Sequence, residues 1–433
     1  MSLIGLLSCD SNEPQTASTL SLTLEDVSCT EAWLQLKSSN IQLPNNIRLL
    51  VNSAVKKTFT LSTQDSLLYI DSLLPNQSYK FLATMQQSNN TSNELTFTTM
   101  DTTSHNFTCR TFNFGQHSSS VLNDVAIINE NDIWAVGRIY MNDSLGNPDL
   151  ICYDAVHWDG NSWELIKIGG YGGYTRSSVI AFSENDVWFD GVIKWDGLSY
   201  SVHMDGWPLM PNGDGWQVNK MWGRSSNDFY AVGSYGNIAY YNGVVWKKLT
   251  SGTLLFLVDI IENKVGEVLI VGDNYSEIKG IVIKSQDGIN FSTLVESEIV
   301  SGSQIFKPKL AGSLHSAWAD QNNTIYVAGD FLYQYKFNKW NYITSFPHNY
   351  LGGNYYASYF GFITGISGKY SNDMWVVGDR NTVRHFNGIS WQQIGTSYNP
   401  NSSTTWVDVQ VKNNITAIIG SIGNQAAIMI IKR

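Results

Sequence analysis

The sequence repeats Asn131-Asp132-Ile133-Trp134-Ala135-Val136-Gly137 three more times. The copies are Asn185-Asp186-Val187-Trp188, Asn227-Asp228-Phe229-Tyr230-Ala231-Val232-Gly233 and Asn372-Asp373-Met374-Trp375-Val376-Val377-Gly378. Asn and Asp favour a turn because their short side chains hydrogen-bond to the nearby backbone. The apolar residues that follow favour a buried strand. A turn-and-strand motif that returns every ~40 residues is typical of a radial or solenoid repeat.

A second motif follows each copy of the first. It occupies residues 157–163, 194–200, 241–246 and 386–391, and each copy contains Asp-Gly or Asn-Gly and ends in an aromatic residue. These dipeptides favour the type I′ turn of a β-hairpin. With the apolar run that precedes the first motif, each repeat predicts four antiparallel strands. Four antiparallel strands form one blade of a β-propeller.

The two ends of the repeat region predict how the ring closes. The last repeat, residues 406–431, has only three predicted strands. Residues 107–115 have the pattern of an outer strand but precede the first repeat. We expect this segment to complete the last blade, because the pairing removes an exposed edge. With the divergent repeats between residues 257 and 343, the predicted fold is all-β, with a seven-bladed propeller over residues 104–433.

Residues 18–103 predict a separate β-sandwich. Leu74-Pro75-Asn76-Gln77-Ser78-Tyr79-Lys80-Phe81 resembles the fibronectin type III pattern, in which a turn leads into a tyrosine corner. Trp33 lies where that family has a core tryptophan, and residues 94–99 resemble its last strand. The resemblance implies a fibronectin type III-like domain that acts as a spacer or a contact module.

The N-terminus predicts a location. Leu3-Ile4-Gly5-Leu6-Leu7-Ser8-Cys9 resembles a bacterial lipobox, which implies lipidation of Cys9. Residues 1–17 are then a lipoprotein signal remnant and a tether. The Asn-Asp-x-Trp-x-Val-Gly repeats also resemble those of bacterial secreted or lipoprotein propellers, some of which carry enzyme names such as glycosyltransferase. The expected location is the bacterial cell envelope, lipid-anchored and outward facing, or the secreted fraction.

Composition argues against several classes of partner and site. The formal net charge is −10 and the 27 Lys and Arg residues are scattered, so the sequence predicts no nucleic-acid partner. Cys29, Cys109 and Cys152 form no Cys-x-x-Cys pair and are predicted to be buried, unpaired thiols. The seven His residues lack the spacing of zinc ligands. The sequence therefore predicts neither a metal nor another cofactor.

The repeated acidic residues are predicted to be structural. Asp132, Asp186, Asp228 and Asp373 stand in the turn motif, where we interpret them as turn formers. Residues 285–291 resemble the Asp-box of sialidase-like propellers, which has a structural role. A sialidase would also need three convergent arginines, and the arginines here show no such spacing.

The long connections predict one working face. In a propeller, the loops between blades and the loops between second and third strands open on the same face. These loops include residues 140–154, 169–176, 203–217, 297–314 and 346–362, whereas the opposite face has tight turns. Loop aromatics can stack on sugars or on partner side chains, or they can pack the loops onto the ring. The candidate ligand-binding residues are Tyr171, Tyr174, Asp205, Trp207, Asp214, Trp216, Tyr350, Tyr355, Tyr356 and Tyr359.

Three functions fit this sequence. The leading hypothesis is a lipid-anchored binding protein whose loop-rich face binds a glycan or a surface protein. The second is a carbohydrate-active enzyme, a glycosidase or lyase, that uses acids such as Asp143, Asp154, Asp205 or Asp214. The third is a structural component of a cell-surface assembly. Two carboxylates that converge in the mouth of the ring would favour the enzyme, because glycoside hydrolysis requires such a pair.

Overall fold

The computed structural model describes residues 18–87, 90–170, 172–210, 215–274, 276–298, 310–343, 362–395 and 402–433. Among these residues the secondary structure is β-strand apart from two short 3-10 turns, η1 (Ile168–Gly170) and η2 (Ser234–Gly236). No helix in these ranges has the length and hydropathy needed to cross a membrane. Contacts divide the chain into two compact units, Met1–Thr102 and Thr103–Arg433. The all-β prediction is confirmed for the described residues.

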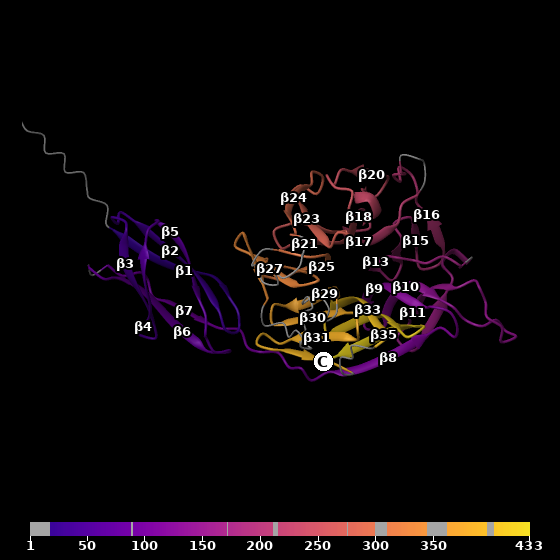
Figure 1. Ribbon diagram of the computed structural model, residues 1–433, viewed down its shortest axis with the longest axis horizontal. Helices are drawn as coiled ribbons and strands as arrows, with labels where there is room; N and C mark the ends of the chain where they lie inside the picture. Colours follow the sequence, from indigo (N-terminus) through magenta and orange to yellow (C-terminus); the bar gives the residue numbers. More distant parts are fainter. Residues whose placement is uncertain are drawn as a thin grey trace, which may run out of the picture. The chain divides into compact units, whose positions relative to one another are not determined.

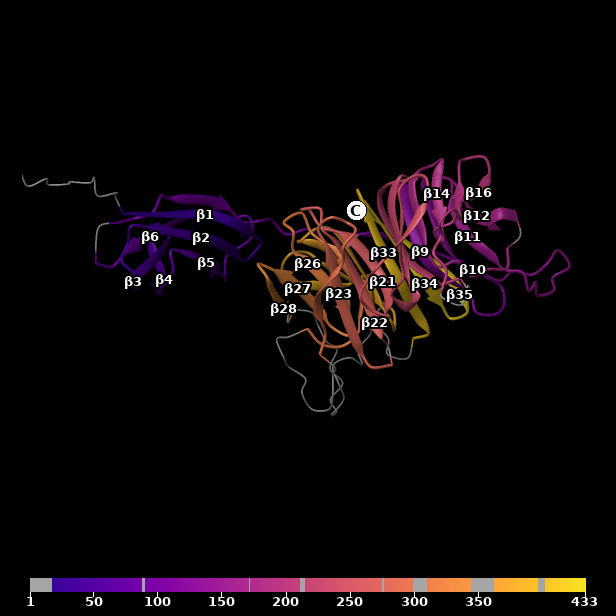
Figure 2. The same cartoon turned by 90° about the horizontal axis from the view of Figure 1, so that it is seen from above.

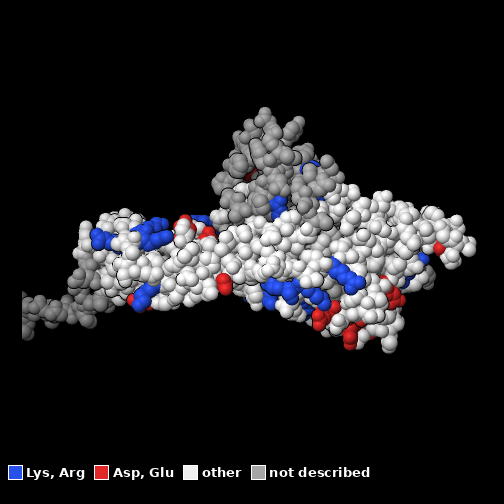
Figure 3. Space-filling view, turned by 90° about the horizontal axis from the view of Figure 1, so that it is seen from below, with Lys and Arg blue, Asp and Glu red and all other residues white. Residues whose placement is uncertain are grey.

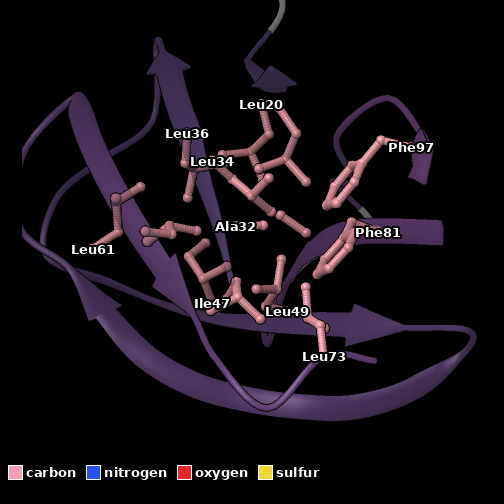
Figure 4. Packing of buried hydrophobic residues seen from close by; sticks show 14 of the residues in the cluster. Leu20, Ala32, Leu34, Leu36, Ile47, Leu49, Leu61, Leu73, Phe81 and Phe97 are labelled. Atoms are coloured by element: carbon pink, nitrogen blue, oxygen red, sulfur yellow. The ribbon is translucent and has the colours of Figure 1, made fainter. Parts of the chain in front are cut away.

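The first unit contains two antiparallel sheets. One has the order β1-β2-β5, from β1 (Thr19–Val27), β2 (Ala32–Ser39) and β5 (Asp65–Ile70). The other has the order β4-β3-β6-β7, from β4 (Ala54–Leu61), β3 (Asn45–Val51), β6 (Ser78–Met85) and β7 (Leu95–Thr98). Alternate side chains of these strands form one apolar core, as expected where two sheets pack face to face. Figure 4 shows Leu34, Leu49 and Phe81 pointing into it.

Two residues of this unit test the sequence interpretation. The Tyr79 hydroxyl accepts a hydrogen bond from the Leu74 N–H at 2.8 Å, which is the contact of a tyrosine corner. Trp33 does not lie in the core, so that prediction is wrong. Ala32 and Leu34 on β2 are buried, and side chains alternate along a strand, so Trp33 points to the other face. There its ring packs on Tyr69 with a centroid distance of 5.4 Å.

The second unit contains seven four-stranded antiparallel sheets among its described residues, numbered here in chain order. Sheet 1 has β9 (Val121–Asn129), β10 (Asp132–Ile139), β11 (Tyr153–Trp158) and β12 (Trp163–Ile166). Sheet 2 has β13 (Val179–Ser183), β14 (Asp186–Phe189), β15 (Ile193–Trp195) and β16 (Tyr200–Val202). Sheet 3 has β17 (Val218–Ser225), β18 (Asp228–Gly233), β19 (Ile238–Tyr241) and β20 (Trp246–Leu249). Sheet 4 has β21 (Phe256–Glu262), β22 (Val268–Asn274), β23 (Lys279–Ser285) and β24 (Ser292–Glu296).

The remaining three sheets complete the set. Sheet 5 has β25 (Leu314–Ala319), β26 (Ile325–Gly329), β27 (Leu332–Lys336) and β28 (Lys339–Tyr342). Sheet 6 has β29 (Ile363–Tyr370), β30 (Asp373–Gly378), β31 (Thr382–Phe386) and β32 (Trp391–Gln393). Sheet 7 has β33 (Thr404–Lys412), β34 (Ile415–Ile422), β35 (Gln425–Lys432) and β8 (Thr108–Phe114). The predicted pairing of the segment at 107–115 with the C-terminal sheet is therefore observed.

The first strands of the sheets stand around a common centre. Each contacts the first strand of the next sheet, and β33 of sheet 7 contacts β9 of sheet 1. Figure 1 shows these strands toward the middle of the second unit and β8 at its outer edge, where β8 pairs with β35 from Ala426↔Phe114 to Lys432↔Thr108. In the perpendicular view of Figure 2, β9, β21 and β33 are seen lengthwise. This arrangement is that of the blades of a propeller.

The glycine of the repeated motif has a steric cause. In sheets 1 and 3 to 7 the pairing of the first two strands shifts register by a β-bulge beside this position. The bulge brings a first-strand carbonyl against the glycine. A Cβ on Gly137 would lie 2.0 Å from the Val121 carbonyl oxygen, and one on Gly233 would lie 1.9 Å from that of Gln217. No larger residue fits without moving the backbone.

The aspartate of the motif begins a strand and contacts the next one. Asp132 is the first residue of β10, and its Oδ1 lies 2.9 Å from Nε2 of His157 on β11. The same contact joins Asp373 to His385 at 2.8 Å, and Asp186 pairs with Lys194 at 3.0 Å. These carboxylates therefore link second and third strands, which extends the predicted turn role.

The described cysteines differ in exposure. Cys29 and Cys152 are buried and form no disulfide, as predicted, and the Cys29 thiol donates to the Asp101 carbonyl at 3.2 Å. Cys109 also forms no disulfide but is exposed, so its predicted burial is wrong. It lies on β8, the outer strand of sheet 7, where side chains on one face meet solvent.

Candidate binding site

The centre of the ring is built from one equivalent position in each first strand. In sheets 1 and 3 to 7 this residue lies at the bulge described above, and in sheet 2 the matching residue, Ser178, directly precedes β13. The seven residues, from sheet 1 to sheet 7, are Asp124, Ser178, Lys220, Asp259, Ser316, Gly365 and Asp408. The set contains three acids and one base, Lys220. The charge state of the centre therefore depends on which carboxylates contact Lys220.

Lys220 joins opposite sides of the ring. Its Nζ lies 2.7 Å from Asp124 Oδ1 and 2.6 Å from Asp408 Oδ2. Burial acts to lower the pKa of Lys220, but attraction to Asp124, Asp408 and Asp259 outweighs it and raises that pKa well above its ordinary value. Burial raises the pKa of Asp124 to about 6 although Lys220 opposes the shift. The lysine is therefore charged and holds these carboxylates in place.

The same carboxylates bind neighbouring sheets. Asp124 Oδ2 accepts hydrogen bonds from the Ser178 hydroxyl at 2.8 Å and the Val179 N–H at 2.9 Å. Asp259 Oδ2 accepts from the Ser316 hydroxyl and the Ala317 N–H, each at 2.8 Å. Each contact crosses from one sheet to the next. The polar centre is thus a belt of hydrogen bonds that ties the first strands together.

The belt separates two cavities on the axis. Lys220, Asp259, Ser316 and Asp408 line both of them. The cavity among the starts of the first strands has a volume of about 470 Å³, and the one toward their ends has about 290 Å³. The larger cavity opens on the face that carries the loops between sheets, and we call it the mouth cavity. Its size is within the range of ligand-binding pockets.

Polar and apolar groups share the wall of the mouth cavity. Its residues, besides the four above, are Val121, Asn123, Arg138, Thr175, Ser177, Gln217, Asn219, Phe256, Val258, His315, Thr364 and Val407. Several of its polar groups are bound to the ring, such as the Asn219 amide, which donates to the Leu257 carbonyl at 2.9 Å. Burial, with a smaller effect of Lys220, lowers the pKa of His315 to about 4, so this imidazole is neutral at physiological pH.

An exposed aromatic pair lies beside this cavity. Phe256 lines the wall and is 44% exposed, and Tyr235 is 57% exposed. Their ring centroids are 6.0 Å apart. Tyr235 lies in η2, with φ of +57°, a conformation that is uncommon for a bulky residue. Exposed aromatics next to a polar cavity are typical of interaction surfaces.

The predicted loop aromatics fall into two groups. Tyr174 is 64% exposed, with the Arg176 guanidinium 5.5 Å from its ring. Trp207 and Trp216 stack on each other with centroids 5.1 Å apart and planes 2° apart. Trp216 is 8% exposed and its Nε1 donates to the Pro208 carbonyl at 2.8 Å. These two indoles pack the loop onto sheet 3, and among the described aromatics of the set Tyr174 faces solvent.

Other predicted residues lie elsewhere. Asp205 is exposed, and its backbone carbonyl accepts from the Trp246 N–H at 2.9 Å. Tyr171, Asp214, Tyr350, Tyr355, Tyr356, Tyr359 and Cys9 lie outside the described residues.

Two of the acids proposed for catalysis, Asp143 and Asp154, form structural contacts. Asp143 Oδ1 accepts from the N–H groups of Leu145 and Asn147 at 2.9 and 2.8 Å, within its own turn. Asp154 is buried beside Arg176, at 3.8 Å, and accepts from the Ile168 N–H at 3.1 Å. Burial raises the pKa of Asp154. Within the described ranges, no group of three or more His, Cys, Asp or Glu side chains is arranged to hold a metal ion.

Sequence reasoning missed the central residues. Their signal is a charged residue inside an apolar first strand, as in Leu257-Val258-Asp259-Ile260-Ile261. Recognising that signal requires knowing which strand of each repeat lines the axis.

On the face drawn in Figure 3, Lys and Arg form small groups separated by uncharged surface.

No protein-family model matches the sequence, and no curated protein matches it. Solved structures do resemble it. A structure described as YCF48 bound to D1 peptide has a TM-score of 0.52 at 14% identity, and the match covers 75% of this chain and 94% of that one. PorZ, a bacterial surface component of the type-IX secretion system of Porphyromonas gingivalis, has a TM-score of 0.50 at 9% identity. That match covers 94% of this chain and 62% of PorZ. At these identities the likeness shows the fold, which is a β-propeller.

Proposed function

We propose that this chain is an extracytoplasmic binding protein whose second unit is a seven-bladed propeller that binds a protein segment at its mouth. The observation that carries the proposal is the mouth cavity with the exposed pair Tyr235 and Phe256 at its edge. A recess with mixed polar and apolar walls suits a peptide, which brings both backbone polar groups and side chains. The propeller structure of YCF48 with a peptide supports a protein partner in general.

The mouth favours binding over catalysis. Asp124 and Asp408 both contact one lysine nitrogen, so two carboxylates do converge at the centre. Both are paired with Lys220, and Asp124 also accepts hydrogen bonds from sheet 2. A glycosidase needs one carboxyl group free to donate a proton and another free to attack or to activate water. The pair is therefore better suited to holding the ring together.

The first unit fits a stalk. We propose a fibronectin type III-like domain, because its three-stranded and four-stranded sheets enclose one core and Tyr79 makes the corner contact.

A glycan at the mouth is the second candidate ligand, and the exposed ring of Tyr174 is the observation that favours it. A structural role in a cell-surface assembly is compatible with the same surface.

The protein-binding proposal predicts that the partner contacts the mouth and not the turn face. A photo-crosslinking residue at position 235 is expected to trap a partner in the native host, whereas one at Tyr370, which is 43% exposed at the end of β29, is not. With the partner identified, Phe256→Ala should weaken binding about tenfold or more, because exposed aromatics are common hot spots. Tyr370→Ala is the matched control. Equal crosslinking from both positions, or unchanged affinity of Phe256→Ala, would argue against the mouth.

The proposed anchor makes a separate prediction. If Cys9 is lipidated, the full chain expressed in a bacterial host should incorporate labelled palmitate and sediment with membranes. Cys9→Ser is expected to abolish the label and release the protein. Cys109→Ser, which changes an exposed thiol on β8, should change neither result. A wild-type protein without label contradicts the anchor and leaves the mouth proposal standing.

A further inference from the structure

A second recess lies between sheets 1 and 2, away from the mouth. It has a volume of about 860 Å³, the larger end of the range for ligand pockets. Its rim includes the turn that joins β9 to β10 and the turn that joins β13 to β14. These turns follow the ends of the first strands, so this inter-sheet cleft opens toward the face opposite the mouth.

The cleft lies beside the short outer strands of sheet 2. Its outer strands β15 and β16 have three residues each, whereas β11 and β12 of sheet 1 have six and four. Figure 1 shows β15 and β16 beside β10 and β11. Residues of both sheets line the cleft. Trp195 at the end of β15 and Tyr200 at the start of β16 are half-buried in the wall of the cleft.

Aromatic rings form one wall. The centroids of Trp195 and Tyr200 are 4.8 Å apart, and those of Trp134 and Trp195 are 6.4 Å apart. Trp134 lines the same cleft and stacks on His157 at 4.2 Å. It is 3% exposed, and its Nε1 has no hydrogen-bond partner among the described residues. Trp134 is therefore the buried base of this aromatic wall, and Trp195 and Tyr200 are its accessible rings.

Polar groups suited to hydroxyls surround the rings. Asn131 and Asn185 bring exposed side-chain amides, and Glu164 and Glu184 bring exposed carboxylates. The basic side chains are fewer: His157 is bound to Asp132 at 2.9 Å, and Lys167 lies 3.7 Å from Asp149. Burial raises the pKa of Tyr200 to about 12, with a further effect of Glu164, so its hydroxyl keeps its proton and can donate. The acidic surplus disfavours an anionic ligand.

We propose that the inter-sheet cleft binds a neutral oligosaccharide, whose rings pack on Trp195 and Tyr200 while Asn185 and Glu164 bind its hydroxyls. The apolar faces of pyranose rings match the wall of aromatic rings, and hydroxyls match amides and carboxylates. A uronic or sialic acid would meet the negative rim and is excluded. The site is independent of the mouth, so the chain has two binding faces.

The test is a glycan array and titration calorimetry with neutral glucan, mannan, galactan and chitin oligosaccharides, using the full chain. Wild type is expected to bind at least one neutral class and to reject polyuronates. Trp195→Ala should weaken that binding about tenfold. Glu164→Gln and Tyr200→Phe keep the packing and remove one polar contact each, so a weakening of about threefold to tenfold is expected without a change in Tm. Tyr370→Ala, an exposed tyrosine on sheet 6, is the matched control and should bind as wild type.

Four results would overturn the proposal, and the first three concern the cleft alone. The first is that wild type binds no neutral oligosaccharide up to millimolar concentration. The second is that Trp195→Ala, Glu164→Gln and Tyr200→Phe all bind the oligosaccharide as wild type does. The third is that the cleft binds a peptide in preference to an oligosaccharide. If glycan binding is instead lost on Phe256→Ala and kept in the cleft variants, the sugar occupies the mouth, which also refutes the cleft site. Loss of the protein partner in Phe256→Ala with intact glycan binding would separate the two faces.

Discussion

Replacing Lys220 by methionine is expected to lower the free energy of unfolding by about 3–5 kcal/mol at pH 7, measured by urea denaturation of the full chain. Lys220 is the cation that contacts Asp124 and Asp408. Methionine keeps most of its volume but leaves the buried Asp124 and the partly buried Asp408 without a counter-charge. Removing one partner of a buried ion pair costs far more than the pair contributes, because the remaining charge has lost its water as well.

The pH dependence distinguishes this cause from a packing defect. Burial already raises the pKa of Asp124 to about 6, and loss of Lys220 would raise it further. Protonation then neutralises the orphaned carboxylate, so the deficit of Lys220→Met should shrink as the pH falls toward about 5. Lys247→Met, an exposed lysine on β20, is the control and should change stability by less than about 0.5 kcal/mol. A deficit that is the same at both pH values would show that the ammonium charge is not what matters.

Local signals were sufficient to predict the sheets of the second unit. The four predicted Asp-Gly and Asn-Gly hairpins are observed, and Gly160, Gly197, Gly243 and Gly388 have φ of +91°, +92°, +88° and +98°. The predicted type I′ turn is wrong, because it needs positive φ at both central residues and the preceding Asp159, Asp196, Asn242 and Asn387 do not have it. The pairing of β8 with β35 was predictable too. The last repeat lacks a fourth strand, and a strand that belongs to no complete repeat precedes the first one, so their pairing completes the last sheet. Strand periodicity gives the face of each residue only when the register is known. This is why Trp33, one position from two core residues, was misplaced.

The candidate site could be predicted only in part. Aromatics in a long loop have the same sequence pattern whether they face solvent or pack inward, and Trp207 and Trp216 turned out to stack on each other. The belt at the centre depends on residues far apart in the chain, since Asp124 and Lys220 are 96 positions apart. The inter-sheet cleft lies beside the short strands β15 and β16, and no single motif reports a difference in strand length.

Another buried acid lies near the mouth face, between sheets 4 and 5. Asp273, near the end of β22, is 0% exposed, and neither carboxylate oxygen has a hydrogen-bond partner among the described residues. Burial raises its pKa to about 7, and Asp330 of sheet 5 adds to the shift, while Ser313 opposes it. The folded protein therefore holds this proton to about pH 7, whereas an unfolded chain releases it near pH 4. The stability from the protonated form is full below about pH 4 and is lost as the pH rises through about 7.

Asp273→Asn is therefore expected to raise the free energy of unfolding at about pH 8 by roughly 2–4 kcal/mol and to leave it nearly unchanged at about pH 4. The amide has the shape of the protonated acid but cannot ionise, so the variant avoids the cost of a buried charge. Denaturant midpoints at both pH values measure the effect, and Asp205→Asn makes the same chemical change at an exposed position. A gain of equal size at both pH values would trace the effect to a cause other than ionisation. Destabilisation at pH 8 would contradict the prediction, because it would show that the charged carboxylate does not cost the folded protein stability.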